Sequence, residues 1–292
     1  MIQNDKTNME TDDVSVNKIK IPQYAFTHAG KFHSDDVFSS ALLTYLNPDI
    51  KIIRGYVIPE DFKGIVFDIG GGKYDHHQED ALVRDNGVSY AAFGLLWKEF
   101  GGLILSEKDA NNFDKSFVQP LDYSDNTGAY NEMAELISLF NPNWDEDLDY
   151  DACFNEAKEI AMAILIKKFN FIKSLNRAEN FVKDAVEKAE ESIVVLPKRA
   201  PWKPFVEGTD IEFVVYPSDR GGFNAQGVPT SMGSANLKIP FPKEWRGKSA
   251  DELKAISGID TLSFCHNSGF LISAGTIEDT IRACKISKVQ GK

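Results

Sequence analysis

Four of the five histidines in this 292-residue chain fall between residues 28 and 77, and two of them are adjacent. His28 and His33 belong to the segment THAGKFHSDD, and His76 and His77 to the segment FDIGGGKYDHHQ. Aspartates accompany both pairs, at positions 35, 36, 68 and 75. Imidazole and carboxylate without thiolate suit Mn²⁺ or Mg²⁺ better than a structural zinc ion. Several carboxylates can also bridge two cations ~3.5–4 Å apart, and such pairs serve phosphoryl transfer.

The adjacent histidines make a specific prediction about direction. Successive side chains on an extended segment point to opposite faces. We therefore expect one of His76 and His77 to face a metal, and the other to face substrate or a nearby carboxylate. A single histidine is more often a structural group than a metal ligand, but this arrangement is hard to explain by packing alone.

The elements around these motifs predict an α/β fold. Residues 23–28 and the segments KIIRGYVI and GIVFDIG are predicted strands, and SDDVFSSALLTYL and SYAAFGLLWKEFG are predicted helices. This order is typical of a mainly parallel sheet flanked by helices and joined by right-handed crossovers. The four histidines follow strand ends, and open α/β sheets bind ligands outside the carboxyl ends of their strands.

We expect two domains. Residues from about 106 to 192 are predicted to be mostly helical, and the segment PKRAPWKPFVEG, with prolines at 197, 201 and 204, is the best linker candidate. After it, DIEFVVYP and TLSFCHNSGFLISAG read as strands, and SADELKAISG and TIEDTIRACKIS as helices. The prediction is a flexible tail over 1–20, a metal-binding catalytic domain over 21–196, a linker over 197–205 and a smaller C-terminal α/β domain over 206–292.

Composition limits the setting and the partners. The chain has 32 basic and 44 acidic residues, a formal charge of −12, which disfavours tight non-specific binding to long nucleic acid. The three cysteines are scattered, so neither disulfides nor a cysteine zinc site is expected. No apolar stretch approaches the roughly 18 residues that span a bilayer, and the N-terminus lacks a signal-peptide pattern. We expect no membrane partner and a cytoplasmic location.

In combination, the motifs resemble the Myg family of metal-dependent hydrolases, which is linked to exonuclease activity, within the DHH phosphoesterase superfamily. The resemblance is carried by THAGKFHSDD, FDIGGGKYDHHQ, LDYSDNTGAYNE, APWKPF and FPKEWRGKSADEL…FCHNSGF, in the family's order, and it spans about residues 24 to 285. It implies a DHH-type N-terminal domain and a C-terminal domain that closes over the metals and selects substrate.

The resemblance also implies roles for single residues. The implied metal ligands are His28, His33, Asp35, Asp68, His76 and Asp125. Asp68 is implied to bridge two ions, and His77 to contact the scissile phosphate or the leaving oxygen. Superfamily members usually have aspartate where His33 stands, and one fewer residue after the first histidine, so the assignment of His28 and His33 departs from the pattern. Asp122 is the alternative to Asp125.

In the C-terminal part, an arginine and a glycine-rich backbone could cradle a phosphate. The predicted substrate-binding residues are Arg220, Gly221, Gly222, His266, Ser268 and Gly269. Arg220 and His77 would together stabilise charge on the phosphoryl oxygens. The equally weighted alternative is that the glycines serve turns and that Arg220 pairs with a surface acid.

The predicted function is metal-dependent phosphodiester hydrolysis with two Mn²⁺ or Mg²⁺ ions, as an exonuclease on short single-stranded RNA or DNA. A pyrophosphatase or a cyclic-dinucleotide phosphodiesterase is the nearest alternative enzyme. Pyrophosphate would require several basic groups, whereas only Lys31, Lys73 and Arg84 lie near the motifs. A non-catalytic nucleotide- or metal-sensing protein is the alternative from another class, and the sequence leaves the oligomeric state open.

Overall fold

The structure is a computed structural model that describes residues 21–290, so the predicted flexible tail over residues 1–20 lies outside the described residues. Contacts divide the chain into two compact units, Met1–Phe169 and Asn170–Lys292. The division falls inside the long helix α6 (Tyr150–Glu187). It differs from the linker predicted at 197–205, since Trp202 of that segment is buried in the core of the C-terminal unit with Val206 and Val214.

The N-terminal unit is built on a parallel sheet of three strands, as the sequence predicts. Its strands are β1 (Tyr24–His28), β2 (Lys51–Gly55) and β3 (Ile65–Val66), in the order β2-β1-β3. Phe26 of β1 pairs with Ile53 on one side and Val66 on the other. Because β1 is central and all strands are parallel, the residues that follow β1 and β3 emerge at the same edge.

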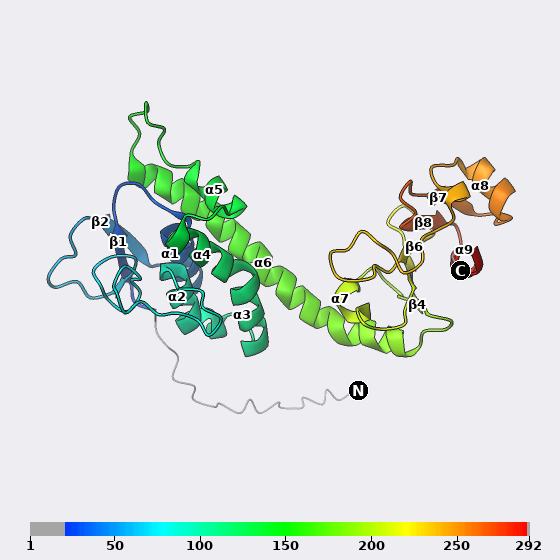
Figure 1. Cartoon of the computed structure of the whole chain (residues 1–292), viewed down its shortest axis with the longest axis horizontal. Helices are drawn as coiled ribbons and strands as arrows, with labels where there is room; N and C mark the ends of the chain where they lie inside the picture. The colour runs from blue at the N-terminus through cyan, green and yellow to red at the C-terminus, as the bar shows by residue number, and fades with distance from the viewer. Residues whose placement is uncertain (1–20, 291–292) are drawn as a thin grey trace, which may run out of the picture. The chain divides into compact units, whose positions relative to one another are not determined.

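Helices pack beside this sheet. They are α1 (Ser34–Leu46), α2 (Ala92–Phe100), η1 (Gly101–Leu103), α3 (Glu107–Phe113), η2 (Asp114–Val118), α4 (Gln119–Thr127) and α5 (Glu132–Ser138). Helix α1 contacts α2, α4 and α5, and Figure 1 shows α1, α2 and α4 gathered together. Val37, Phe38, Ala41 and Leu42 of α1 are fully buried, so this apolar face of α1 forms part of the core.

The C-terminal unit is a mixed sheet with helices. Its elements after α6 are β4 (Ile193–Val195), α7 (Lys203–Val206), β5 (Phe213–Pro217), β6 (Phe223–Gly227), η3 (Lys243–Trp245), α8 (Ala250–Ser257), β7 (Leu262–Cys265), β8 (Leu271–Ala274) and α9 (Ile277–Gln290). The strand order is β4-β5-β6-β8-β7, and only the β4–β5 pair is parallel. The α/β fold class is therefore confirmed for both units. Within the described residues, no helix combines the length and the apolar character that crossing a bilayer requires.

Candidate metal centre

Asp68 occupies a strained position directly after the sheet. Its backbone φ is +59°, a left-handed conformation that costs a non-glycine residue about 1–3 kcal/mol and that concentrates at functional sites. The Asp68 amide donates to the Tyr74 carbonyl at 3.0 Å, with Gly70 and Gly71 at φ +89° and +66° in the loop between them. This loop turns the chain back, so that the DHH segment runs beside the end of β3.

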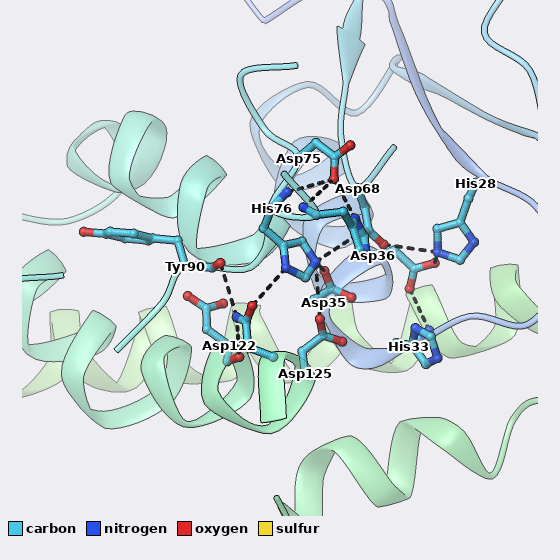
Figure 2. A network of polar contacts seen from close by, with 12 residues as sticks. His28, His33, Asp35, Asp36, Asp68, Asp75, His76, Tyr90, Asp122 and Asp125 are labelled. Atoms are coloured by element: carbon cyan, nitrogen blue, oxygen red, sulfur yellow. Dashed lines mark hydrogen bonds and ion pairs between the residues drawn. The ribbon is translucent and has the colours of Figure 1, made fainter. Parts of the chain in front are cut away.

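The two carboxylate oxygens of Asp68 face different histidines. Asp68 Oδ2 lies 3.1 Å from His28 Nε2, and Oδ1 lies 3.2 Å from His76 Nε2. Figure 2 shows Asp68 between the two rings, with the other aspartates around them. One carboxylate can therefore contribute to two separate groups of potential metal ligands.

The first group consists of His28, Asp36 and Asp68, whose ligand atoms lie within 4.8 Å of one another. His28 Nε2 is 3.1 Å from Asp36 Oδ2. The other oxygen of Asp36 accepts a hydrogen bond from the His33 amide at 3.0 Å, at the start of α1. Asp36 is fully buried, yet the sequence interpretation omitted it as a ligand. The only signal was the pair of consecutive aspartates after Ser34.

The second group surrounds His76, whose ligand atom lies within 4.8 Å of those of Asp68 and His77. Its Nε2 lies 3.3 Å from Asp125 Oδ2 and 3.7 Å from Asp35 Oδ2. Asp125 also groups with His33 and Asp35 within 4.8 Å. The structure thus brings both histidines of the segment THAGKFHSDD to the cluster, with the His28 and His33 rings 6.2 Å apart.

Asp122, the alternative to Asp125, faces elsewhere. Its carboxylate is 2.7 Å from Arg84 Nη2 and accepts a hydrogen bond from the Gly94 amide at 3.1 Å. A Cβ on Gly94 would lie 1.9 Å from Asp122 Oδ2, so only glycine fits there. Asp122 therefore anchors α4 to α2, while Asp125, one turn later, reaches the candidate metal centre.

The prediction that His76 and His77 point in opposite directions is wrong. Their ring centroids are 4.2 Å apart, because the segment is not a strand and its backbone is bent by Asp75. Asp75 Oδ1 accepts hydrogen bonds from the amides of His76 and His77 at 2.8 and 3.2 Å, and from His77 Nδ1 at 2.6 Å. The rings differ in exposure instead: the His76 side chain is 6% exposed and that of His77 is 64% exposed.

The cluster contains more buried carboxylates than positively charged groups to balance them. Burial, followed by the nearby charges of Asp68 and Asp125, raises the pKa of Asp35 well above its usual value. Burial would raise the pKa of Asp68 too, but hydrogen bonds from His28 and His76 outweigh it and lower that pKa to about 2. Burial would lower the pKa of His28, but Asp36 and Asp68 raise it to about 10. Burial would likewise lower the pKa of His76, but Asp68 raises it, so His28 and His76 can hold protons in place of a cation.

The residues present fit divalent ions. Neither oxygen of the fully buried Asp35 has a hydrogen-bond partner, and its neighbour across the cluster is another carboxylate, Asp125. Buried charges of this kind are normally paired or bound to metal. The donors are imidazole nitrogen and carboxylate oxygen, which suit Mn²⁺ and Mg²⁺.

A hollow of about 480 Å³ opens beside the cluster. It is lined by residues of the two histidine segments, of helices α4 and α5 and of the turn between these helices: His33, Ser34, His76, His77, Ser124, Asp125, Asn126, Gly128, Ala129, Ala134, Glu135 and Ser138. None of these is a lysine or an arginine. The hollow therefore gives access to the exposed His77 ring and provides little positive charge of its own.

The predicted substrate-binding residues of the C-terminal unit lie in two turns. Gly221 and Gly222, at φ +91° and +68°, close the β5–β6 turn, beside the exposed Arg220. In the β7–β8 turn, His266 Nδ1 is 2.9 Å from Ser268 Oγ, and Gly269 has φ +70°. The glycines thus do serve turns.

These two turns lie at opposite ends of the β6–β8 ladder. Phe223, next to the first turn, pairs with Ala274, while Gln226 pairs with Leu271, next to the second turn. The structure therefore does not bring the two sets of predicted substrate-binding residues together into one cradle.

Comparisons with known proteins agree with the motifs. Residues 24–287 match the family model MYG1_exonuc, described as an uncharacterised protein family (UPF0160). The chain is 27% identical to the human MYG1 exonuclease, over 94% of this chain and 88% of that protein. It is 27% identical to the MYG1 protein of Dictyostelium discoideum, over 84% and 90%, and 28% identical to that of Chlamydia pneumoniae, over 92% and 98%. No solved structure matches the chain. Because the family model covers nearly the whole described chain, the chain belongs to the MYG1 family.

Proposed function

We propose that this protein hydrolyses phosphodiester bonds with two Mn²⁺ or Mg²⁺ ions, as an exonuclease on short single-stranded RNA or DNA. The observation that carries the proposal is the placement of Asp68, whose oxygens lie 3.1 and 3.2 Å from the Nε2 atoms of His28 and His76. The human relative is named an exonuclease, which supports a nucleic acid substrate. The proposed DHH-type active site uses the two ligand groups that share Asp68.

Residues around Asp68 would bind the metal ions, and the exposed His77 would contact the substrate. His28, Asp36, His33, Asp35, His76 and Asp125 would hold the ions around Asp68. When bound, the two ions would supply an activated water and neutralise charge on the phosphate. His77 is exposed to the hollow, and its Nδ1 is held by Asp75 at 2.6 Å. Its Nε2 is then directed away from Asp75, so it can contact a phosphoryl oxygen or give a proton to the leaving oxygen.

The shape and charge of the hollow favour the end of a strand as substrate. A volume of about 480 Å³ is within the usual range for small-molecule sites and suits one terminal nucleotide. Pyrophosphate is a poorer fit, because two of the three basic side chains near the motifs are engaged. Arg84 is bound to Asp114 and Asp122, and Lys73 lies 2.9 Å from Glu99.

The proposal is tested by measuring turnover of a short RNA, a short DNA, pyrophosphate and a cyclic dinucleotide side by side with Mn²⁺. We expect mononucleotides to be released stepwise from one end of the single strands, and all activity to disappear with chelator. Faster turnover of pyrophosphate or of the cyclic dinucleotide would replace the substrate assignment. Tight Mn²⁺ binding without turnover of any of the four would favour a sensor.

A further inference from the structure

Asn126 links helix α4 to the His76 ring. Its Nδ2 donates to the Asp122 carbonyl at 2.8 Å and to the Tyr90 carbonyl at 3.2 Å. Its Oδ1 lies 3.1 Å from His76 Nδ1. A side-chain amide has one donating and one accepting end, and two carbonyls can only face the donating end. The accepting oxygen of Asn126 must therefore face the imidazole.

This orientation dictates what His76 can do. Because Nδ1 faces only an acceptor, it must carry a proton to make the bond. His76 can then use its Nε2 lone pair on the opposite side of the ring, where the oxygens of Asp68 and Asp125 lie at 3.2 and 3.3 Å. A histidine that binds metal through one nitrogen commonly donates its other N–H to an oxygen in this way, and the bond fixes both tautomer and ring direction.

The support of Asn126 is rigid on both sides. One of its carbonyl partners belongs to Asp122, whose carboxylate is held by Arg84 at 2.7 Å and by the Gly94 amide at 3.1 Å. The other carbonyl partner belongs to Tyr90, whose ring lies against the Arg84 guanidinium. The guanidinium carbon is 3.8 Å from the centroid of the Tyr90 ring. The Arg84–Asp122 pair therefore fixes the position of the amide that orients His76.

We propose that Asn126 is a positioning residue: its side-chain oxygen accepts the Nδ1 proton of His76 and so directs His76 Nε2 to the metal shared with Asp68 and Asp125. The inference rests on the proposed function, since it concerns the same site, but it makes a claim about Mn²⁺ binding alone. It explains why an asparagine directly follows Asp125 in the segment YSDNTG.

The test is a titration of metal-free protein with Mn²⁺ in the absence of substrate. The electron paramagnetic resonance signal of the free ion measures how much Mn²⁺ remains unbound. Asn126→Leu keeps the side-chain size and removes both polar ends. We expect it to weaken the binding of one Mn²⁺ by about tenfold, the lower end of the usual effect of such supporting groups. Asn155→Leu is the matched control, because Asn155 makes the same bond to a carbonyl four residues earlier, Asp151 at 2.8 Å, on α6. It should bind Mn²⁺ like the wild type.

A double-mutant cycle separates positioning from a general structural effect. In a His76→Gln background, Asn126→Leu should cause no further loss of affinity, because its partner is gone. An equal loss in both backgrounds, or affinity within twofold of wild type for Asn126→Leu, would overturn the proposal. If His76→Gln binds too little Mn²⁺ to measure, the comparison of Asn126→Leu with Asn155→Leu decides. Asn126→Ser replaces Asn126→Leu if the latter does not fold. Failure of the substrate assay would leave this binding result unchanged, so the two proposals can fail separately.

Discussion

The N-terminal unit gathers its chemical groups at one edge of a parallel sheet, whereas the C-terminal unit distributes its candidates over both ends of an antiparallel ladder. In a parallel sheet every strand ends at the same edge, so residues after β1 and after β3 meet even though 40 positions separate His28 from Asp68. In the C-terminal unit, β6 and β8 run antiparallel, so the turns that precede them lie at opposite ends. Topology thus decides whether short motifs can cooperate.

The two regions also differ in their effect on the stability of the folded protein. The candidate metal centre buries Asp35, Asp36 and Asp68 together, and Asp68 is in a left-handed conformation. Buried like charges destabilise the metal-free protein, so their presence points to a bound cation. The C-terminal turns contain exposed polar groups and glycines, which a hairpin requires for its own geometry. Substitutions should therefore have large effects in the first region and small effects in the second.

The largest effect is expected for Asp68→Asn. Asparagine tolerates the left-handed backbone but loses the charge shared between the two groups. The kcat/KM on a short strand should fall about 100- to 1,000-fold, equivalent to about 3–4 kcal/mol. The variant should still fold, with a lower melting temperature because the charge that pairs with His28 and His76 is lost. Asp61→Asn, at an exposed carboxylate, is the control. Near-normal turnover of Asp68→Asn would show that Asp68 is only a strand-end residue.

The next effect separates His76 from His77. His76→Ala should weaken Mn²⁺ binding by about 10- to 100-fold, with activity partly restored by excess Mn²⁺, because the buried ring faces Asp68 and Asp125. His77→Ala should leave Mn²⁺ affinity nearly intact and lower kcat and kcat/KM together, because its ring is exposed to the hollow. Metal titration followed by kinetics at saturating Mn²⁺ distinguishes them, and equal behaviour in both measurements would refute the division.

A smaller effect concerns stability without metal. Asp35→Asn removes one buried charge from the cluster. The free energy of unfolding of the metal-free variant should therefore be about 1–3 kcal/mol higher than that of the metal-free wild type. The raised pKa of Asp35, caused by burial and by Asp68 and Asp125, means that ionising this group destabilises the fold as pH rises. The gain should therefore increase with pH. Denaturant titrations in chelator at several pH values measure it, and a variant less stable than wild type throughout would contradict the argument.

The smallest effects are expected in the C-terminal unit, where they test whether either turn takes part. Arg220→Ala should raise KM for a short strand about fivefold, in keeping with about 1 kcal/mol for an exposed charge contact. His266→Ala, at the other end of the ladder, should change KM by less than twofold. Substrate titrations at saturating Mn²⁺ compare them. Equal and large increases in KM would mean that both turns contact the substrate, which a short strand could achieve only by extending along the sheet.

Much of the fold could be predicted because it depends on local patterns. The segments predicted for β1 and α1 match their observed bounds closely. Strand β3 was also predicted, over the segment GIVFDIG, but only Ile65–Val66 forms it. Strand β6 was not predicted, since its sequence, FNAQG, has no strong strand preference. It forms because β5 and β8 provide hydrogen-bond partners on both its edges. That stabilisation comes from segments distant in the chain and leaves no local signal.

The sequence by itself determined the types of donor at the site, their order, and the family, because residue identity and spacing are properties of the chain. Only the tertiary structure decided which donors face one another. It placed Asp125 rather than Asp122 at the cluster, added Asp36, turned the two adjacent histidine rings to within 4.2 Å, and set Asn126 against His76. The direction of each side chain depends on backbone torsion and on partners such as Arg84 and Asp75, which come from other segments or from a bend in the chain. These directions follow from packing and hydrogen bonds, which no spacing rule encodes.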